Sequence, residues 1–124
     1  AGGRLIPADG DARDAVLVQH ALATGIMDAS FASVMENRRP ETSRSGFWLE
    51  RWAVAIERAA SAIRPEPCLE RPRELGEIAT AIALAHVDYR LPAIDWRAVN
   101  RPLADWFTRA EQWDAMLTTP LPPK

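Results

Sequence analysis

The sequence predicts an all-α protein, and three observations lead to this fold class. The 27 residues from Asp11 to Asn37 contain no proline, so they can run as one helix. Further along the chain, apolar residues recur at steps of three and four, which is the spacing of one helix face. No alternating run of about five residues bounded by turns indicates a strand. The prediction is a bundle of about five helices.

The first predicted helix, Asp11 to Asn37, would be about 40 Å long at 1.5 Å per residue. Gly25 is its only interior glycine. Either Asp9 or Asp11 can cap its start and place a negative charge at the positive end of the helix dipole. Its apolar residues point in more than one direction, which predicts burial on two sides.

The second predicted helix runs from about Phe47 to Ile63. It follows a loop, Arg38 to Ser45, in which Ser43 or Ser45 can supply the cap. Its apolar face comprises Leu49, Trp52, Ala53, Ile56, Ala59, Ala60 and Ile63. The charged residues Glu50, Arg51, Glu57 and Arg58 occupy the other face, which we interpret as solvated.

The third predicted helix, Gly76 to Tyr89, is apolar on every side and rich in alanine, as expected of a helix at the centre of a bundle. Before it, Arg64 to Arg73 contains three prolines and reads as a surface connection. After it, Leu91 precedes a proline, which disfavours the helical conformation and ends the helix.

The last part of the chain predicts a short turn and two more helices. Asp95 can cap a turn that starts at Trp96, and Asn100 can cap a helix with Pro102 in its first turn. A short final helix includes Trp113, Met116 and Leu117, before three prolines end regular structure. We therefore predict one domain over residues 1–124, with a linker at 1–10 and an irregular tail at 118–124.

Composition excludes several classes of function. The net charge is −2 and basic and acidic residues are mixed along the chain, so the sequence does not indicate a basic surface for nucleic acid. No apolar run approaches the roughly 18 to 20 residues that span a bilayer, so we expect a cytoplasmic protein without a membrane partner. Cys68 is the only cysteine, so an internal disulfide is impossible and no thiolate metal site is expected.

Several segments, in one order, resemble a known family. They are LIP before an acidic start ADGDAR, a long helix with ATGIMDAS, the central segment GEIATAIALAHVDYRLPAIDWR, and the closing RPLADWFTRAEQW with TTP. This ordered set is similar to the C-terminal all-helical domain of glutathione S-transferases. The resemblance covers nearly the whole chain.

The resemblance implies that a second domain carries the catalytic chemistry. In whole proteins of this family a thioredoxin-like N-terminal domain binds glutathione and supplies the catalytic Ser, Tyr or Cys, and that domain is absent from this sequence. The helical domain forms one wall of the substrate cleft. The implied function is a substrate-wall domain of a glutathione-dependent transferase, without a catalytic residue of its own. The alternative is a non-catalytic interaction module of the same fold.

The resemblance also implies which residues face the cleft. Thr24, Met27, Asp28 and Phe31 on the long helix are the expected cleft residues. For Met27 and Phe31 the alternative is packing in the core. Asp28 lies near the position from which some bacterial relatives reach toward bound glutathione. It would receive the amino group of glutathione or a substrate donor, unless it instead bonds an arginine or a helix end inside the bundle.

A further family feature is a capping box at the start of the central helix, which usually reads Ser or Thr followed three residues later by Asp. Aligned with that box, this chain reads Glu77 to Thr80, with the acidic residue first and the hydroxyl last. We expect Glu77 and Thr80 to serve the cap, and Gly76 as the cap is the competing interpretation.

The remaining polar and aromatic residues favour structural roles. His20 and His86 have no nucleophile or acid at a recognisable spacing, so neither catalysis nor metal binding is expected of them. Four of the five tryptophans fit core positions, whereas Trp48 lies outside the apolar stripe and could contact the missing domain or a second copy. Exposed apolar surface beside the long helix is expected to favour self-association, and we predict a homodimer.

Overall fold

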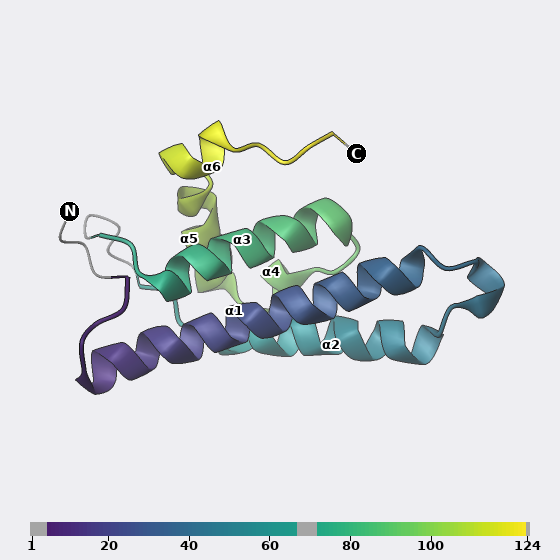
Figure 1. Cartoon of the computed structure of the whole chain (residues 1–124), viewed down its shortest axis with the longest axis horizontal. Coiled ribbons are helices and arrows are strands. Elements are labelled where there is room, and N and C mark those ends of the chain that lie inside the picture. Colours follow the sequence, from purple (N-terminus) through teal and green to yellow (C-terminus); the bar gives the residue numbers. More distant parts are fainter. Residues whose placement is uncertain (1–4, 67–71, 124) are drawn as a thin grey trace.

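Six α-helices make up the part of the chain that the computed structural model describes, residues 5–66 and 72–123 (Figure 1). They are α1 (Gly10–Asn37), α2 (Gly46–Ala62), α3 (Leu75–Arg90), α4 (Trp96–Val99), α5 (Arg101–Ala110) and α6 (Asp114–Thr118), with a 3-10 turn η1 (Glu41–Ser43). The all-α prediction is confirmed, and no strand occurs in the described residues. The helix count exceeds the expected five because the turn capped by Asp95 closes into the one-turn helix α4.

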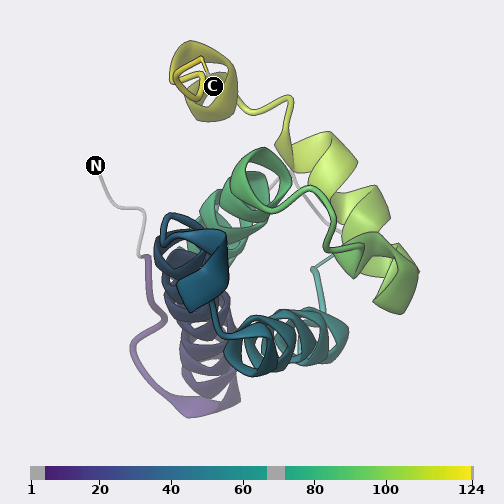
Figure 2. The same cartoon turned by 90° about the vertical axis from the view of Figure 1, so that its right-hand side faces the viewer.

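The long helix α1 packs against both α2 and α3, as the view along the bundle shows (Figure 2). Its contact with α3 is close because α3 brings Gly76 to the surface of α1. A Cβ atom at Gly76 would lie only 3.0 Å from Cβ of Gln19 and from the carbonyl oxygen of Val16. Next to this point the amide of Gln19 donates to the hydroxyl of Thr80 at 3.2 Å. The first helix is buried on two sides, as predicted, because it packs against both α2 and α3.

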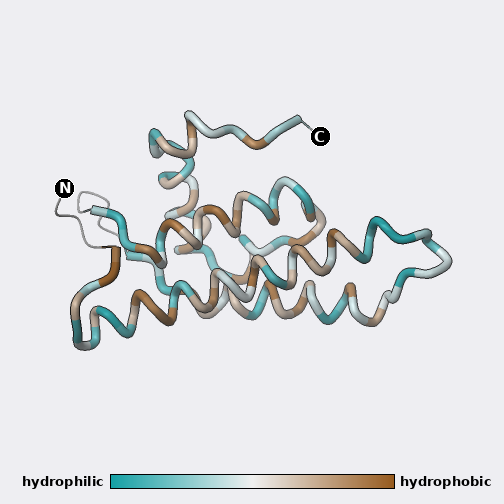
Figure 3. The backbone as a smooth tube through the Cα atoms, viewed as in Figure 1, coloured by the Kyte–Doolittle hydropathy of each residue, from teal (hydrophilic) through white to brown (hydrophobic). Residues whose placement is uncertain are grey.

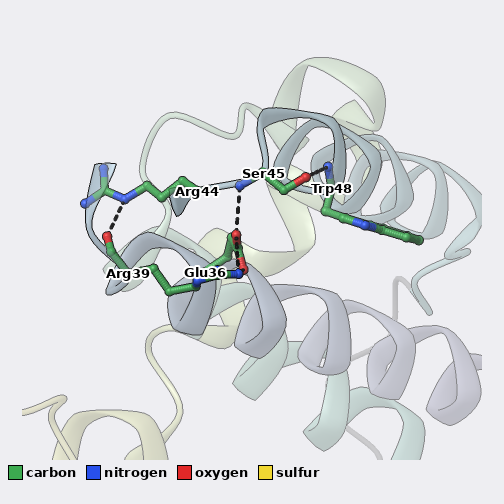
Figure 4. A network of polar contacts seen from close by, with 5 residues as sticks. All are labelled: Glu36, Arg39, Arg44, Ser45 and Trp48. Atoms are coloured by element: carbon green, nitrogen blue, oxygen red, sulfur yellow. Dashed lines mark hydrogen bonds and ion pairs between the residues drawn. The ribbon is translucent and has the colours of Figure 1, made fainter. Parts of the chain in front are cut away.

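The turn between α1 and α2 is held by a carboxylate at the end of α1 (Figure 4). Glu36 accepts a hydrogen bond from the backbone N–H of Ser45 at 2.8 Å and pairs with Arg39 at 3.2 Å. The hydrogen bond from Ser45 is the main cause that lowers the pKa of Glu36 below its usual value. Ser45, rather than Ser43, caps α2, because its hydroxyl accepts from the N–H of Trp48.

The end of α3 is joined to α4 by one carboxylate. Asp88 accepts two hydrogen bonds from the guanidinium of Arg97, at 2.8 and 2.7 Å, and one from the indole N–H of Trp96 at 2.8 Å. The guanidinium also lies 4.3 Å from the centre of the Trp96 ring. The hydrogen bonds to Asp88 raise the pKa of Arg97 further above its usual value, so the guanidinium stays charged.

Asn100 connects the end of α2 to the start of α5. Its side-chain carbonyl accepts from the N–H of Leu103 and caps α5, as predicted. Its side-chain NH2 donates to the carbonyl oxygens of Ala60 and Ile63, at 2.9 and 2.8 Å. Both carbonyls belong to the end of α2, where the Ala60 carbonyl also accepts from the N–H of Ile63 at 3.3 Å. One buried amide therefore satisfies backbone groups of two helices.

The core lies between α1, α2, α3 and α5, and its largest fully buried side chains are Trp96, Trp106 and Phe107. The predicted core role of the tryptophans is confirmed for Trp96, Trp106 and Trp113, and Trp52 packs partly buried against the core. Hydrophobic residues also recur along the length of α1, in line with its two packed sides (Figure 3).

The capping box of α3 lies earlier than we expected from the sequence. Glu74 is the N-cap and Glu77 is the third residue of the helix, where its carboxylate accepts from the N–H of Glu74 at 3.0 Å. Glu77 therefore serves the cap, as expected, but it takes the last position of the box and Glu74 takes the first, so the expected exchange with Thr80 does not occur. The hydroxyl of Thr80 donates instead to the carbonyl of Gly76, one turn back.

By length and composition alone, α1 meets the criteria for a helix that crosses a membrane, contrary to the estimate from apolar runs. Core helices of proteins that fold in water meet the same criteria. This property therefore does not assign α1 to a membrane.

Asn100→Ala should lower the free energy of unfolding by about 2 kcal/mol, because it removes a helix cap and two buried hydrogen bonds to the end of α2. Chemical denaturation followed by circular dichroism measures the change. Asn37→Ala, an exposed substitution of the same type at the end of α1, is the matched control and should change stability by less than about 0.5 kcal/mol. Equal effects of the two variants would contradict the role of Asn100.

Candidate functional site

One side of α1 faces neither α2 nor α3 and carries a row of exposed side chains. Leu17, Phe31 and Met35 are exposed, Phe31 by 63% of its surface. Helical periodicity places His20, Thr24 and Asp28 on the same side. We call this set the α1 stripe: Leu17, His20, Thr24, Asp28, Phe31 and Met35.

Three of the four residues expected to face the cleft lie together on the α1 stripe. Thr24 is half-buried, and its hydroxyl donates to the carbonyl of His20 at 2.9 Å. Asp28 is exposed and makes no hydrogen bond or ion pair with any described residue, so the arginine or helix-end partner that we considered does not occur there. The Asp28 carboxylate is therefore available to a ligand from outside the domain.

Met27 lies at the edge of the α1 stripe. It follows Thr24 by three residues and precedes Phe31 by four, so helical spacing places it beside both. It is partly buried and packs against the hydrophobic core. The side chain thus contributes to packing inside the bundle.

The structure also brings together a pair of residues that the sequence analysis did not connect. The hydroxyl of Ser30 lies 2.7 Å from Nδ1 of His86, which joins the middle of α1 to α3. The two residues are 56 positions apart, so no local motif could reveal their contact. Ser30 is fully buried, which prevents a substrate from reaching its hydroxyl and argues against a nucleophile.

A second feature that the sequence did not reveal is a cavity of about 520 Å³ between α3 and α6. Its apolar wall includes Ile78, Ile82, Trp113 and Met116. The guanidinium of Arg73 lies 4.2 Å from the centre of the Trp113 ring. The buried indole N–H of Trp113 has no hydrogen-bond acceptor among the described residues, which leaves a donor unsatisfied next to this cavity.

Within residues 5–66 and 72–123, no group of three or more His, Cys, Asp or Glu side chains is arranged to hold a metal ion. Cys68 lies outside the described residues. On the α1 stripe the described part of the chain offers an exposed apolar surface with one carboxylate, that of Asp28.

Comparison with solved structures identifies the class of protein. A glutathione transferase family member from Pseudomonas fluorescens Pf-5, solved with bound S-(propanoic acid)-glutathione and also with glutathione, is 35% identical with a TM-score of 0.89. The match covers 99% of this chain and 65% or 62% of that protein. A glutathione S-transferase from Methylobacterium radiotolerans, in complex with glutathione sulfonate, is 27% identical over 97% of this chain and 61% of its own, with a TM-score of 0.78.

A third glutathione S-transferase, from Methylobacillus flagellatus with glutathione bound, is 29% identical with a TM-score of 0.80, over 94% of this chain and 61% of its own. No family model and no curated protein matches the chain. The chain thus has the all-helical fold found in glutathione transferases and spans about 65% of the first relative's length. The recognition of a glutathione S-transferase-like C-terminal helical domain is confirmed.

Acidification should destabilise the fold through His86. Burial is the main cause that lowers the pKa of His86 below 6.5, and Arg90 adds to it. As the pH falls, the unfolded chain therefore binds a proton at His86 before the folded chain does. The contribution of neutral His86 to the free energy of unfolding is fully present above the unfolded pKa of about 6.5. It is lost as the pH falls from there toward the lower pKa of the folded chain. Denaturant midpoints measured from pH 7.5 to 5 test this, and His86→Gln should flatten the profile. His20→Gln is the matched control, and an equal flattening by both variants would contradict the assignment.

Proposed function

We propose that this chain forms one wall of the substrate cleft in a glutathione S-transferase-like enzyme, and that the α1 stripe is that wall. The observation that carries the proposal is the exposed position of Phe31 beside the unpaired carboxylate of Asp28. A cleft that holds an apolar electrophile next to glutathione needs an exposed apolar surface with a charged group beside it. The domain itself contributes no catalytic residue.

In this proposal a separate thioredoxin-like domain binds glutathione and activates its thiol. Two features of this chain support a partner domain. The chain spans only 61 to 65% of the glutathione transferases named above. The α1 stripe leaves large apolar side chains exposed.

The roles within the stripe follow from the chemistry of its side chains. The Phe31 ring and the Met35 side chain would contact the apolar part of the electrophile. The Asp28 carboxylate would accept hydrogen bonds from the protonated amino group of glutathione or from a substrate donor. The proposal further places the enzyme in the cytoplasm and includes self-association of the chain into a homodimer.

A non-catalytic interaction module is the second candidate. It is favoured by the exposed aromatic residues at the start of α2, Phe47 and Trp48, which lie on a different helix from the proposed cleft wall. A module of this kind would bind its partner without need of glutathione, which makes the two candidates separable by experiment.

Substitution of Phe31 by alanine should lower kcat/KM for an apolar electrophile by roughly tenfold in the full-length protein, because the ring loses its buried contact with the substrate. The KM for glutathione should stay unchanged. Val18→Ala is the matched control, since Val18 is similarly exposed, by 60%, and lies on α1 away from the stripe. Steady-state kinetics with both substrates varied measures the effect. Equal losses in both variants would mean that the stripe does not form the wall.

The 124-residue chain alone should show no detectable heat when it is titrated with glutathione, because most of the glutathione site belongs to the other domain. Asp28→Ala is the paired variant. If the chain alone binds glutathione and Asp28→Ala weakens the binding, this domain carries part of the glutathione site by itself. Tight binding that is insensitive to Asp28 would contradict the assigned role of that carboxylate.

A further inference from the structure

The hydrogen bond between Ser30 and His86 lies at one edge of the contact between α1 and α3. Ser30 is fully buried and His86 is partly buried, and the Oγ and Nδ1 atoms are 2.7 Å apart. The other ring nitrogen, Nε2, bonds to no residue in 5–66 or 72–123, and it is not a buried atom. The two nitrogens lie on opposite sides of the imidazole ring. Nε2 therefore points away from Ser30 and reaches the surface.

Ser30 separates the side of α1 that faces α2 from the side that carries the α1 stripe. Ser33, about 60° around the helix in one direction, lines a hollow together with residues of α2. Phe31 lies about 100° in the other direction and is exposed. His86 thus meets α1 between its packed side and the stripe.

Helical spacing also places His86 on the outer side of α3. Gly76 marks the line along which α3 touches α1. Leu84 lies about 80° to one side of that line and is fully buried. His86 lies about 80° to the other side, and Ile82, which is 51% exposed, lies one turn before it. Phe31, Ile82 and Nε2 of His86 therefore belong to one outer face of the α1–α3 pair, away from the core.

The hydrogen bond also determines which ring nitrogen of His86 carries the hydrogen. Serine hydroxyls inside helices commonly donate to the carbonyl one turn back, as Ser33 does to Ala29 at 2.9 Å. Ser30 makes no such bond within the described part of the chain, so its hydroxyl donates to Nδ1. Burial, with a smaller contribution from Arg90, lowers the pKa of His86, so the ring is neutral at physiological pH. In a neutral imidazole whose Nδ1 accepts, Nε2 carries the hydrogen.

We propose that the Nε2–H group of His86 is a hydrogen-bond donor in the substrate cleft, and that it selects apolar electrophiles that carry a carbonyl oxygen. The exposed apolar side chains of the same face would hold the hydrocarbon part of such a molecule, and the single donor would fix its orientation. Unsaturated ketones and aldehydes belong to this class, whereas alkyl and benzyl halides do not. The inference rests on the proposed function and adds the class of electrophile to it.

Ser30 is a positioning residue in this proposal, because it acts only through His86. Its hydroxyl holds the imidazole at one orientation and in one tautomer. His86 binds and orients the electrophile and takes no part in making or breaking its bonds. The contact therefore adds to substrate binding, and its loss should raise KM more than it lowers kcat.

Two electrophiles of similar size test the role of His86 in the full-length protein. Benzylideneacetone has a carbonyl oxygen and benzyl chloride has none. His86→Leu should lower kcat/KM for benzylideneacetone by roughly fivefold, the effect of one hydrogen bond, and that for benzyl chloride by less than about twofold. His86→Gln should restore most of the loss, because its amide still donates. Equal losses for the two electrophiles, or no loss for either, overturn the inference.

The support that Ser30 gives is tested with a matched serine. Ser30→Ala should lower kcat/KM for benzylideneacetone by roughly two- to threefold, because the ring of His86 is no longer held. Ser33→Ala is the control, since Ser33 is also buried on α1 and its hydroxyl bonds only within the helix. It should change neither reaction. Losses of the same size in the two serine variants contradict the positioning role.

The tautomer gives a readout that is independent of activity. Nitrogen NMR of labelled histidine in the 124-residue chain should show His86 with its hydrogen on Nε2 at neutral pH. In Ser30→Ala the two tautomers should interconvert and the two nitrogen shifts should move toward each other. A hydrogen on Nδ1 in the wild-type chain overturns the inference.

The proposal of the cleft and this inference fail separately. If Phe31→Ala slows the reaction of both electrophiles and His86→Leu slows neither, the cleft proposal stands and the inference is rejected. If Phe31→Ala slows neither, the cleft proposal is rejected and the inference is rejected with it.

Discussion

The close contact of α1 with α3 at Gly76 determines which surfaces of the bundle are buried and which are free. A Cβ atom at this position would lie 3.0 Å from Cβ of Gln19 and from the backbone oxygen of Val16, so a side chain there would force the helices slightly apart. Alanines continue the contact along α3, and Ser30 and His86 bridge it further along. Because Gly76 and the alanines of α3 are small, the two helices pack closely along a narrow part of the α1 surface. The remainder of the surface of α1 is left for α2 and for the stripe.

This arrangement explains why α1 has no single apolar face. A helix that packs on one side shows one apolar stripe, whereas α1 carries apolar residues toward two helices and also on a third, exposed side. Exposed apolar side chains on that third side are not required by the packing of the bundle. Their presence is therefore better explained by contact with a molecule or a domain outside the described residues.

The sequence predicted the helices well because their signals are local. Proline positions, the caps at Ser45, Asp95 and Asn100, and the apolar spacing of α2 all act within a few residues. The start of α3 was misplaced because Glu74 takes the place of the usual hydroxyl cap. The contact between Ser30 and His86 depends on packing across 56 positions, and no local rule anticipates it.

The candidate site was predictable in part for the same reason. Thr24, Asp28 and Phe31 share a side because helical spacing alone places them there, but spacing does not reveal that Met27 packs against the core.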